Sequence, residues 1–367
     1  MSVALEELEG DPHPLLARLR ESEPVAWVPA LNAWLVTRRD LALAAMRDSA
    51  TFTVDDPRFS TGRVVGRSML TTEGDEHDRH RAPFARRFRL AEVRTQLAGV
   101  VAEETDRLID ALEPHGRGDL RGSLAAPLSA RIVTHSLGLP ESGRVLDWYA
   151  AIVHATTELA RGAEAVTPEA LAAVEELRVA APDHTSDVAT LLFGGIETTE
   201  GMIANALVHL LTHPDQLERV RQDPGLTANA VEESLRLEPA AATIDRYATQ
   251  DTQLASAHIE QGDLVTISIA AANRDPQHFP EPDRFDITRP NAKQHLAFAH
   301  GPHVCIGMHL ARLEAHTAIN RVLERLPRLA LDSTKPAPKP TGLVFRKPEA
   351  VHTKWTPHPP ARERMRP

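Results

Sequence analysis

The chain has 367 residues, of which 42% are hydrophobic and 25% charged, and its formal net charge is −10. This balance is typical of a globular protein, and an acidic chain lacks the basic face of a nucleic-acid-binding protein. No apolar run reaches roughly 18 residues, and the acidic first residues resemble neither a signal peptide nor an anchor, so we expect no membrane association. The single cysteine cannot form an internal disulfide, which favours a cytoplasmic protein.

Ala and Leu dominate the apolar residues, whereas aromatic residues make up only 4%. Because Ala and Leu favour helices and aromatic residues favour strands, we predict a mainly α fold with small β-sheets. The N-terminal part predicts a helix at 13–22, strands at 25–28 and 33–37, and a helix at 40–47. Residues 51–70 lack a regular period and are predicted to be a loop, and 75–111 has helical spacing of apolar residues.

Further helices are predicted at 123–137, 142–161 and 168–180, and the longest at 186–211. That segment would span roughly 39 Å and is apolar nearly all round, so it should be buried. Pro214 suits the first turn of the next helix. The remaining segments, in chain order, are predicted as a helix at 228–238, strands within 240–270, loops over 273–304, a helix at 306–325 and a frayed tail after about 355. Without repeats or linkers, we expect one domain, 1–367.

Cys305 lies in the segment FAHGPHVCIGMHLARLE, residues 298–314, a glycine-punctuated loop that precedes an amphipathic helix. A helix N-terminus stabilises a thiolate. A lone cysteine is often a small buried hydrophobic residue. A protease nucleophile would need a positioned histidine and an acid partner, and a zinc site would need several soft ligands.

The same segment resembles the haem-binding loop of the cytochrome P450 family, F-x-x-G-x-(H/R)-x-C-x-G. The matching residues are Phe298, Gly301, His303, Cys305 and Gly307. The resemblance implies the cytochrome P450 fold, with haem b between the long central helix and this loop and with Cys305 as the proximal iron ligand. A thiolate ligand pushes electron density onto the iron and favours O–O cleavage in this family. Phe298 and the loop amides would shield and hydrogen-bond the sulfur.

Glu233 and Arg236 lie at i and i+3 of a predicted helix, an arrangement that alone indicates only a surface ion pair. In the family this E-x-x-R pair is joined by an arginine of a P-x-R-F segment. The resemblance therefore implies a structural role for Glu233, Arg236 and Arg284.

The buried helix contains the segment FGGIETT, residues 193–199. Gly194 and Gly195 each cost about 1 kcal/mol relative to Ala in a helix, so a kink or a ligand-binding groove is expected there. Glu197 in an apolar helix should be paired or functional. The segment resembles the family's oxygen-activation motif, which implies that Thr198 orders water and dioxygen and that Glu197 helps to deliver protons. Alternatively, Thr198 hydrogen-bonds only to its own helix.

His77 and Arg81 share one helix face and could reach the same anionic group, although such a pair is usually a solvated basic face. They resemble the H-x-x-x-R helix of the family, which binds the haem propionates. His303 and Arg246 match other propionate-binding positions. Four cationic or titratable groups suit two carboxylates.

About 120 residues separate His77 from Thr198, which is short for the family. We expect trimmed roof helices and a more open distal pocket, suited to a bulky substrate or to one presented by a carrier. Topology suggests eight wall residues: Met69, Leu70, Phe193, Gly194, Thr243, Ile244, Val344 and Phe345.

The resemblance implies a monooxygenase that activates O2 and hydroxylates or epoxidises a small organic substrate, in secondary metabolism. Electrons from NAD(P)H would arrive through a ferredoxin or flavodoxin, and Arg86, Arg87 and Arg312 could dock such an acidic partner. Alternatives are oxidative coupling, dehydration or peroxide-driven chemistry on the same haem. Outside enzymes, the alternatives are a haem-based sensor, a catalytically silent haem binder and a haem-free helical scaffold.

Overall fold

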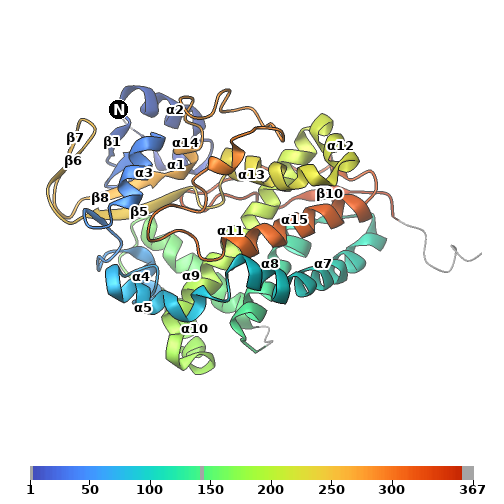
Figure 1. The fold of residues 1–367 in the computed structure, drawn as a ribbon, viewed down its shortest axis with the longest axis horizontal. Coiled ribbons are helices and arrows are strands. Elements are labelled where there is room, and N and C mark those ends of the chain that lie inside the picture. Colours follow the sequence, from blue (N-terminus) through green and yellow to red (C-terminus); the bar gives the residue numbers. More distant parts are fainter. Residues whose placement is uncertain (1–2, 141–143, 358–367) are drawn as a thin grey trace, which may run out of the picture.

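The computed structural model describes residues 3–140 and 144–357. In this part of the chain, helices form most of the molecule, and the strands form three small sheets (Figure 1). The predicted fold class, mainly α with small β-sheets, is confirmed. The prediction for the tail concerns mostly residues 358–367, which lie outside the described residues.

The helices are α1 (Leu5–Glu9), α2 (His13–Ser22), α3 (Arg39–Arg47), α4 (Ser60–Val65), α5 (Gly74–Ala85), α6 (Leu90–Glu92), α7 (Ala98–Leu112), α8 (Ala126–Leu137), α9 (Arg144–Ala160), α10 (Pro168–Ala180), α11 (Thr185–Thr212), α12 (Pro214–Gln222), α13 (Thr227–Leu237), α14 (Ile269–Ala272) and α15 (Met308–Arg325). The strands are β1 (Val25–Val28), β2 (Ala33–Val36), β3 (Phe52–Thr53), β4 (Arg117–Asp119), β5 (Thr243–Ala248), β6 (Thr252–Leu254), β7 (Ala257–Ile259), β8 (Leu264–Ser268), β9 (Ala330–Leu331) and β10 (His352–Lys354).

Two of the sequence predictions need correction. The segment 51–70 is not wholly a loop, because it contains β3 and α4. The helical stretch 75–111 is interrupted: α5 ends soon after Pro83, and the π-helical turn Val93–Leu97 precedes α7. Pro83 lacks the N–H that would continue the helix, and Arg89 adopts an extended backbone conformation. Apolar spacing alone did not reveal this interruption.

Helix α11 runs through the middle of the molecule (Figure 1). Most of its residues are buried, as expected for a helix that is apolar nearly all round. It packs against α8, α9, α13 and α15, so the largest hydrophobic core surrounds it. Nevertheless, none of the described helices is both long and apolar enough to cross a membrane.

The largest sheet has the strand order β1-β2-β8-β5-β3 and lies beside α1, α2 and α3 (Figure 1). Strand β5 pairs antiparallel with β8, and Arg246 lies opposite Val265 in this register. Because alternate residues of a strand point to opposite faces, β5 directs Ile244 and Arg246 to the same side. The sheet thus carries Arg246 toward the helical part of the molecule, where the cavity described below lies.

Glu233 of α13 is fully buried between two arginines. It accepts hydrogen bonds from Arg236 at 2.7 and 2.8 Å and from Nε of Arg289 at 2.9 Å. The predicted third member, Arg284, is wrong: its side chain is exposed and pairs with Glu281, and only its backbone carbonyl joins the network. Arg289 takes that place because it lies five residues further along the turn, where its side chain points inward.

Replacing Arg289 with Ala should lower the free energy of unfolding by about 3 kcal/mol, because it removes a partner of a buried carboxylate. Arg284→Ala should change this free energy by less than about 0.5 kcal/mol, since it removes an exposed pair. Chemical denaturation followed by circular dichroism measures both. Equal losses in the two variants would contradict the assignment of Arg289 to the network.

Candidate functional site

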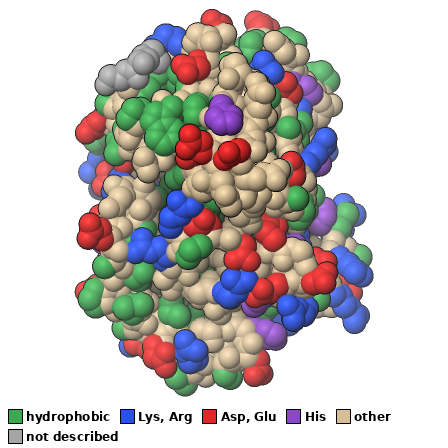
Figure 2. Space-filling model, turned by 90° about the vertical axis from the view of Figure 1, so that its left-hand side faces the viewer, with side chains coloured by type: hydrophobic (Ala, Val, Ile, Leu, Met, Phe, Trp, Pro, Cys, Tyr) green, Lys and Arg blue, Asp and Glu red, His purple; other side chains and the backbone are tan. Residues whose placement is uncertain are grey.

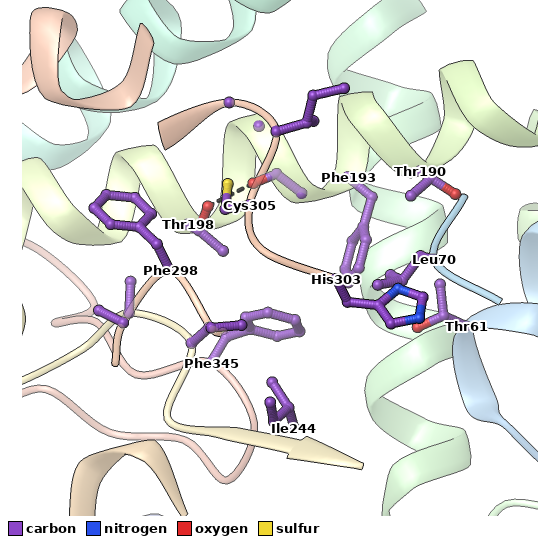
Figure 3. A pocket seen from close by; sticks show the side chains of 18 of the residues that line it. Thr61, Leu70, Thr190, Phe193, Thr198, Ile244, Phe298, His303, Cys305 and Phe345 are labelled. Carbon is purple, nitrogen blue, oxygen red and sulfur yellow. Dashed lines mark hydrogen bonds between the residues drawn. The ribbon is translucent and has the colours of Figure 1, made fainter. Parts of the chain in front are cut away.

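One large cavity lies between α11, the helices α4 and α9, the β5 strand and the loop that carries Cys305 (Figure 3). We call α4, α9 and the neighbouring α10 the roof of this cavity. The volume of this cavity, counted as the space open to the centres of water-sized molecules, is about 300 Å³. Its wall is mostly apolar, and the Cys305 and Thr198 side chains both contribute to it. The cavity therefore brings together residues that are more than one hundred positions apart in the sequence.

Backbone contacts fix the conformation of the cysteine loop. The N–H of Cys305 donates to the carbonyl of Phe298 at 2.9 Å, which closes the loop. Gly301 has a φ of +77°, and a Cβ at this position would lie 2.4 Å from the Met46 carbonyl oxygen. Only glycine fits there. At Gly307 a Cβ would meet no described atom within 4 Å, so this glycine leaves space beside the cysteine.

The Cys305 thiol opens onto the cavity and is exposed there, although protein atoms surround its base. Burial among these atoms raises the pKa of the thiol. The backbone N–H groups of Gly307 and Met308 and the charges of Arg81 and Arg312 oppose this shift. A Lewis-acidic metal would favour the thiolate further, since the thiolate is the form that ligates.

Cationic and titratable side chains gather at one end of the cavity. Arg81, Arg246 and His303 line it, and the ring of His77 packs on that of His303 with centroids 4.6 Å apart. Nε2 of His77 is buried and has no hydrogen-bond partner within the described part of the chain. This unpartnered ring nitrogen donates in the Nε2–H tautomer or in the imidazolium, and in either form it fits an anionic ligand together with the two guanidinium groups.

Other contacts hold this cluster in place. Nη2 of Arg81 donates to the Val304 carbonyl at 2.7 Å, so α5 is tied directly to the cysteine loop. Nε2 of His303 lies 2.9 Å from a carboxylate oxygen of Glu73. Burial lowers the pKa of Arg246, whereas the charge of Glu73 raises it. The set of a thiol, an open space at Gly307 and cationic groups at one end fits a haem with its two propionates.

Thr198 lies on the cavity wall, and its hydroxyl donates to the Gly194 carbonyl at 2.5 Å (Figure 3). This is the internal helix bond considered as an alternative, and it leaves the oxygen lone pairs of Thr198 available to accept. A Cβ at Gly194 would meet no described atom within 4 Å, whereas one at Gly195 would lie 2.8 Å from the Val133 side chain. Gly194 therefore opens the helix toward the cavity, and Gly195 also permits close packing on α8.

Glu197 is not part of the cavity wall as the described residues form it. Its buried carboxylate accepts a hydrogen bond from the Tyr149 hydroxyl and lies 2.8 Å from Nζ of Lys347. Glu200 shares both partners, at 3.3 Å from Tyr149 and 3.0 Å from Lys347, and also pairs with Arg121. Sequence reasoning did not find these partners, because Tyr149, Lys347 and Arg121 come from three distant segments.

All eight residues suggested for the pocket lie on the cavity wall: Met69, Leu70, Phe193, Gly194, Thr243, Ile244, Val344 and Phe345. Whether they contact a substrate stays a prediction. Sequence reasoning missed Thr61 of α4 and Thr156 of α9, which also line the cavity. It also missed Glu314 of α15, a buried cavity-lining residue whose pKa is raised well above its usual value by burial. The pattern ARLEAHTAI gave no signal for Glu314, because it is typical of an amphipathic surface helix.

Arg312 is not a free surface cation, in contrast to the prediction for partner docking. Its guanidinium pairs with Glu232 through two hydrogen bonds, at 2.6 and 2.9 Å. Arg87 donates to the Ser136 carbonyl, and Arg86 stays exposed with only a 3.5 Å contact to Glu92. Of the three predicted docking residues, only Arg86 and Arg87 are available at the surface.

Comparisons with known proteins agree with this geometry. A model of the cytochrome P450 family matches residues 178–354. Cytochrome P450 monooxygenase PikC of Streptomyces venezuelae is 36% identical over 363 residues, covering 89% of this chain and 86% of that protein. The 6-deoxyerythronolide B hydroxylase of Saccharopolyspora erythraea is 31% identical, with 86% and 88% covered. The structure of P450BioI in complex with a fatty-acid-loaded acyl carrier protein has a TM-score of 0.86 at 28% identity, covering 96% and 99% of the two chains.

The connection between the roof and α11 is short. Only the 3₁₀ turn Pro182–His184 separates α10 from α11. The alignment with PikC has 363 positions but takes up only 89% of this chain, so that relative carries residues that have no counterpart here. The short α10–α11 connection agrees with the prediction of a shortened chain before α11.

Proposed function

The chain belongs to the cytochrome P450 family and is a monooxygenase, and from this premise we propose that its single domain, residues 1–367, oxidises a bulky, neutral organic molecule with O2. One observation carries the proposal: the Cys305 thiol and the Thr198 hydroxyl face the same cavity, whose far end carries the cationic groups. Hydroxylation or epoxidation of a secondary metabolite is the reaction that we favour, in line with the named activity of the 6-deoxyerythronolide B hydroxylase.

The proposed cofactor is haem b, held by Cys305 on the iron and by His77, Arg81, Arg246 and His303 on the propionates. When bound, it supplies the reductive activation of O2. The protein's part is to hold the thiolate, to exclude bulk water and to position proton donors. Gly301 lets the cysteine loop pack on the Met46 carbonyl, Gly307 leaves space for a flat ligand, and Phe298 lines the same cavity.

The purified protein reconstituted with haem should give the thiolate-type spectrum of the reduced carbon monoxide complex. Cys305→Ser should lose this spectrum, because an alcohol does not replace the thiolate as an electron donor to iron. His77→Ala is the matched control: it should weaken haem retention without changing the spectral type of the haem that remains. A thiolate-type spectrum in Cys305→Ser would refute the proposed ligand, and failure of the wild type to bind haem would refute the function.

We assign proton handling to Thr198 and Glu197. Thr198 lies on the cavity wall, and its neighbour Glu197 is buried behind it against Tyr149 and Lys347. The side chain of Lys347 is 16% exposed and that of Glu197 only 5%, so Lys347 lies on the solvent side of the pair. Protons can therefore reach Glu197 through Lys347 and Tyr149, and Thr198 could donate to a ligand in the cavity once its hydroxyl rotates away from the Gly194 carbonyl.

Thr198→Ala should lower the yield of product per electron pair by up to about 100-fold, because a positioned proton donor is lost. Hydrogen peroxide should be released in place of product. Glu197→Gln should slow O2-driven turnover by a similar factor. Thr199→Ala is the control, since the adjacent Thr199 also lines the cavity. Measurement of O2 consumed, peroxide released and product formed tests the assignment. Equal uncoupling in Thr199→Ala would contradict it.

The substrate should be largely apolar and uncharged. The charged residues of the wall lie near the cysteine and at the cationic end, whereas apolar and hydroxyl groups such as Phe193, Phe345 and Thr61 form the distal part. The hydroxyl of Thr156 on α9 is buried and has no hydrogen-bond partner in the described part of the chain. A polar group of the substrate is a suitable partner for it.

We favour a free substrate over one attached to a carrier protein. Carrier proteins are acidic and would need unpaired cations on the roof. Within residues 144–181, Arg144 pairs with Glu176, Arg161 with Glu9 and Arg178 with Glu175. On the face in Figure 2, acidic and basic side chains are also interspersed. The carrier-bound ligand of P450BioI is therefore not the model that we prefer.

Titration of the haem-loaded protein with macrolides, terpenes, free fatty acids and a fatty acyl carrier protein should shift the Soret band toward the high-spin form only with a large neutral compound. Thr156→Val should weaken that binding by about tenfold, the value of one hydrogen bond. Thr157→Val, at the adjacent position that also lines the cavity, is the control. A shift only with the acyl carrier protein would contradict the free-substrate proposal.

Electrons should come from NAD(P)H through a separate ferredoxin or flavodoxin. Helix α5 is tied to the cysteine loop through Arg81, and the chain that follows it carries the exposed Arg86 and Arg87. These residues lie near the ligand loop and could attract an acidic partner.

A further inference from the structure

A second buried carboxylate precedes Glu233 on α13. Glu232 is 1% exposed and accepts both hydrogen bonds of Arg312, from Nε at 2.6 Å and from Nη2 at 2.9 Å. Nε2 of His295 lies 3.2 Å from the same carboxylate. Because a bidentate pair fixes the plane of a guanidinium, Glu232 determines where the Arg312 charge lies.

Arg312 connects this carboxylate to the cysteine loop. Its guanidinium carbon lies 4.5 Å from the centroid of the Phe298 ring. The Phe298 carbonyl in turn accepts the N–H of Cys305. Figure 3 shows Phe298 and Cys305 on the same loop beside α11. A continuous series of contacts therefore runs from α13 through Arg312 and Phe298 to the cysteine.

The charges in this series are well defined. Burial raises the pKa of Glu232, but His295 and Arg312 lower it to about 2, so the carboxylate is ionised at neutral pH. The Arg312 guanidinium contacts the Phe298 ring, and the Phe298 carbonyl accepts the Cys305 N–H, so the positive charge lies against the cysteine loop. The side chain of Arg312 is only 22% exposed, so water screens its charge less than that of a surface arginine.

We propose that Arg312, anchored by Glu232, is a positioning residue for the cysteine ligand: it holds the Phe298 ring and keeps a positive charge against the cysteine loop. The inference rests on the proposed function, because it requires haem on Cys305. A nearby positive charge withdraws electron density from the thiolate and stabilises the reduced iron. The Glu232–Arg312 pair thus makes the haem easier to reduce and keeps the thiolate in place.

The test is the reduction potential of the full-length, haem-loaded protein, measured by spectroelectrochemical titration. Arg312→Gln should have a more negative potential than the wild type, and its reduced carbon monoxide complex should convert faster to the thiol-ligated form. Arg321→Gln is the matched control on the same helix, where the arginine is 38% exposed and pairs with Asp106 and Glu324. It should leave both quantities unchanged.

Arg312→Gln leaves Glu232 without its main partner in the interior, which endangers folding. The double variant Glu232→Gln, Arg312→Gln removes both charges together and keeps similar side-chain shapes. It should also have a more negative potential than the wild type, because Arg312 contacts the cysteine loop through Phe298, whereas Glu232 reaches it through Arg312.

The outcomes separate this inference from the proposed function. A wild-type protein without a thiolate-type carbon monoxide spectrum would refute the function before any potential is measured. A normal wild-type spectrum with unchanged potentials in both Arg312 variants would overturn only the inference. An equal shift in Arg321→Gln would overturn it too, because the effect would then not depend on contact with Phe298.

Discussion

The rest of the site depends on one interaction, the pairing of the buried Glu233 carboxylate with two arginine side chains. A fully buried charge must be paired, and here two guanidinium groups from different segments converge on it. Arg236 and Arg289 use their remaining donors on backbone carbonyls of the irregular stretch around residues 273–284. This stretch contains little regular structure, so side-chain contacts replace the missing backbone ladder. It leads directly into the cysteine loop, whose position therefore depends on α13.

The second constraint is the central helix. Because α11 is apolar nearly all round, it can be buried on every side, and the cavity forms where Gly194 leaves a gap. Polar residues of α11 then divide by face. Thr198 opens into the cavity, whereas Glu197 and Glu200 point to a buried cluster with Tyr149 and Lys347. One helix thus separates the cavity from this buried cluster of charged side chains.

The sequence predicted the elements whose pattern is strong and local. Helix α11 and the cysteine loop follow from apolar periodicity and fixed spacing, and each predicted residue of the pocket lies on the cavity wall. What it missed depends on tertiary contacts. Arg284 and Arg289 lie in the same turn-rich segment, and only the folded chain decides which one points toward Glu233. Helix α4 has only six residues, too few to show a helical pattern in the sequence. Its conformation therefore depends on packing against its neighbours.

The adjacent carboxylates of α13 show how one helix turn can serve two purposes. Consecutive residues on a helix point about 100° apart, so Glu232 and Glu233 face different neighbours. Glu233 binds the chain that leads to the cysteine loop, and Glu232 binds Arg312, which contacts the loop itself through Phe298. Both are buried carboxylates, and each lies against arginine side chains of its own. These two residues therefore hold both the chain that leads to the cysteine loop and the arginine that packs on it, and a change in α13 would affect both together.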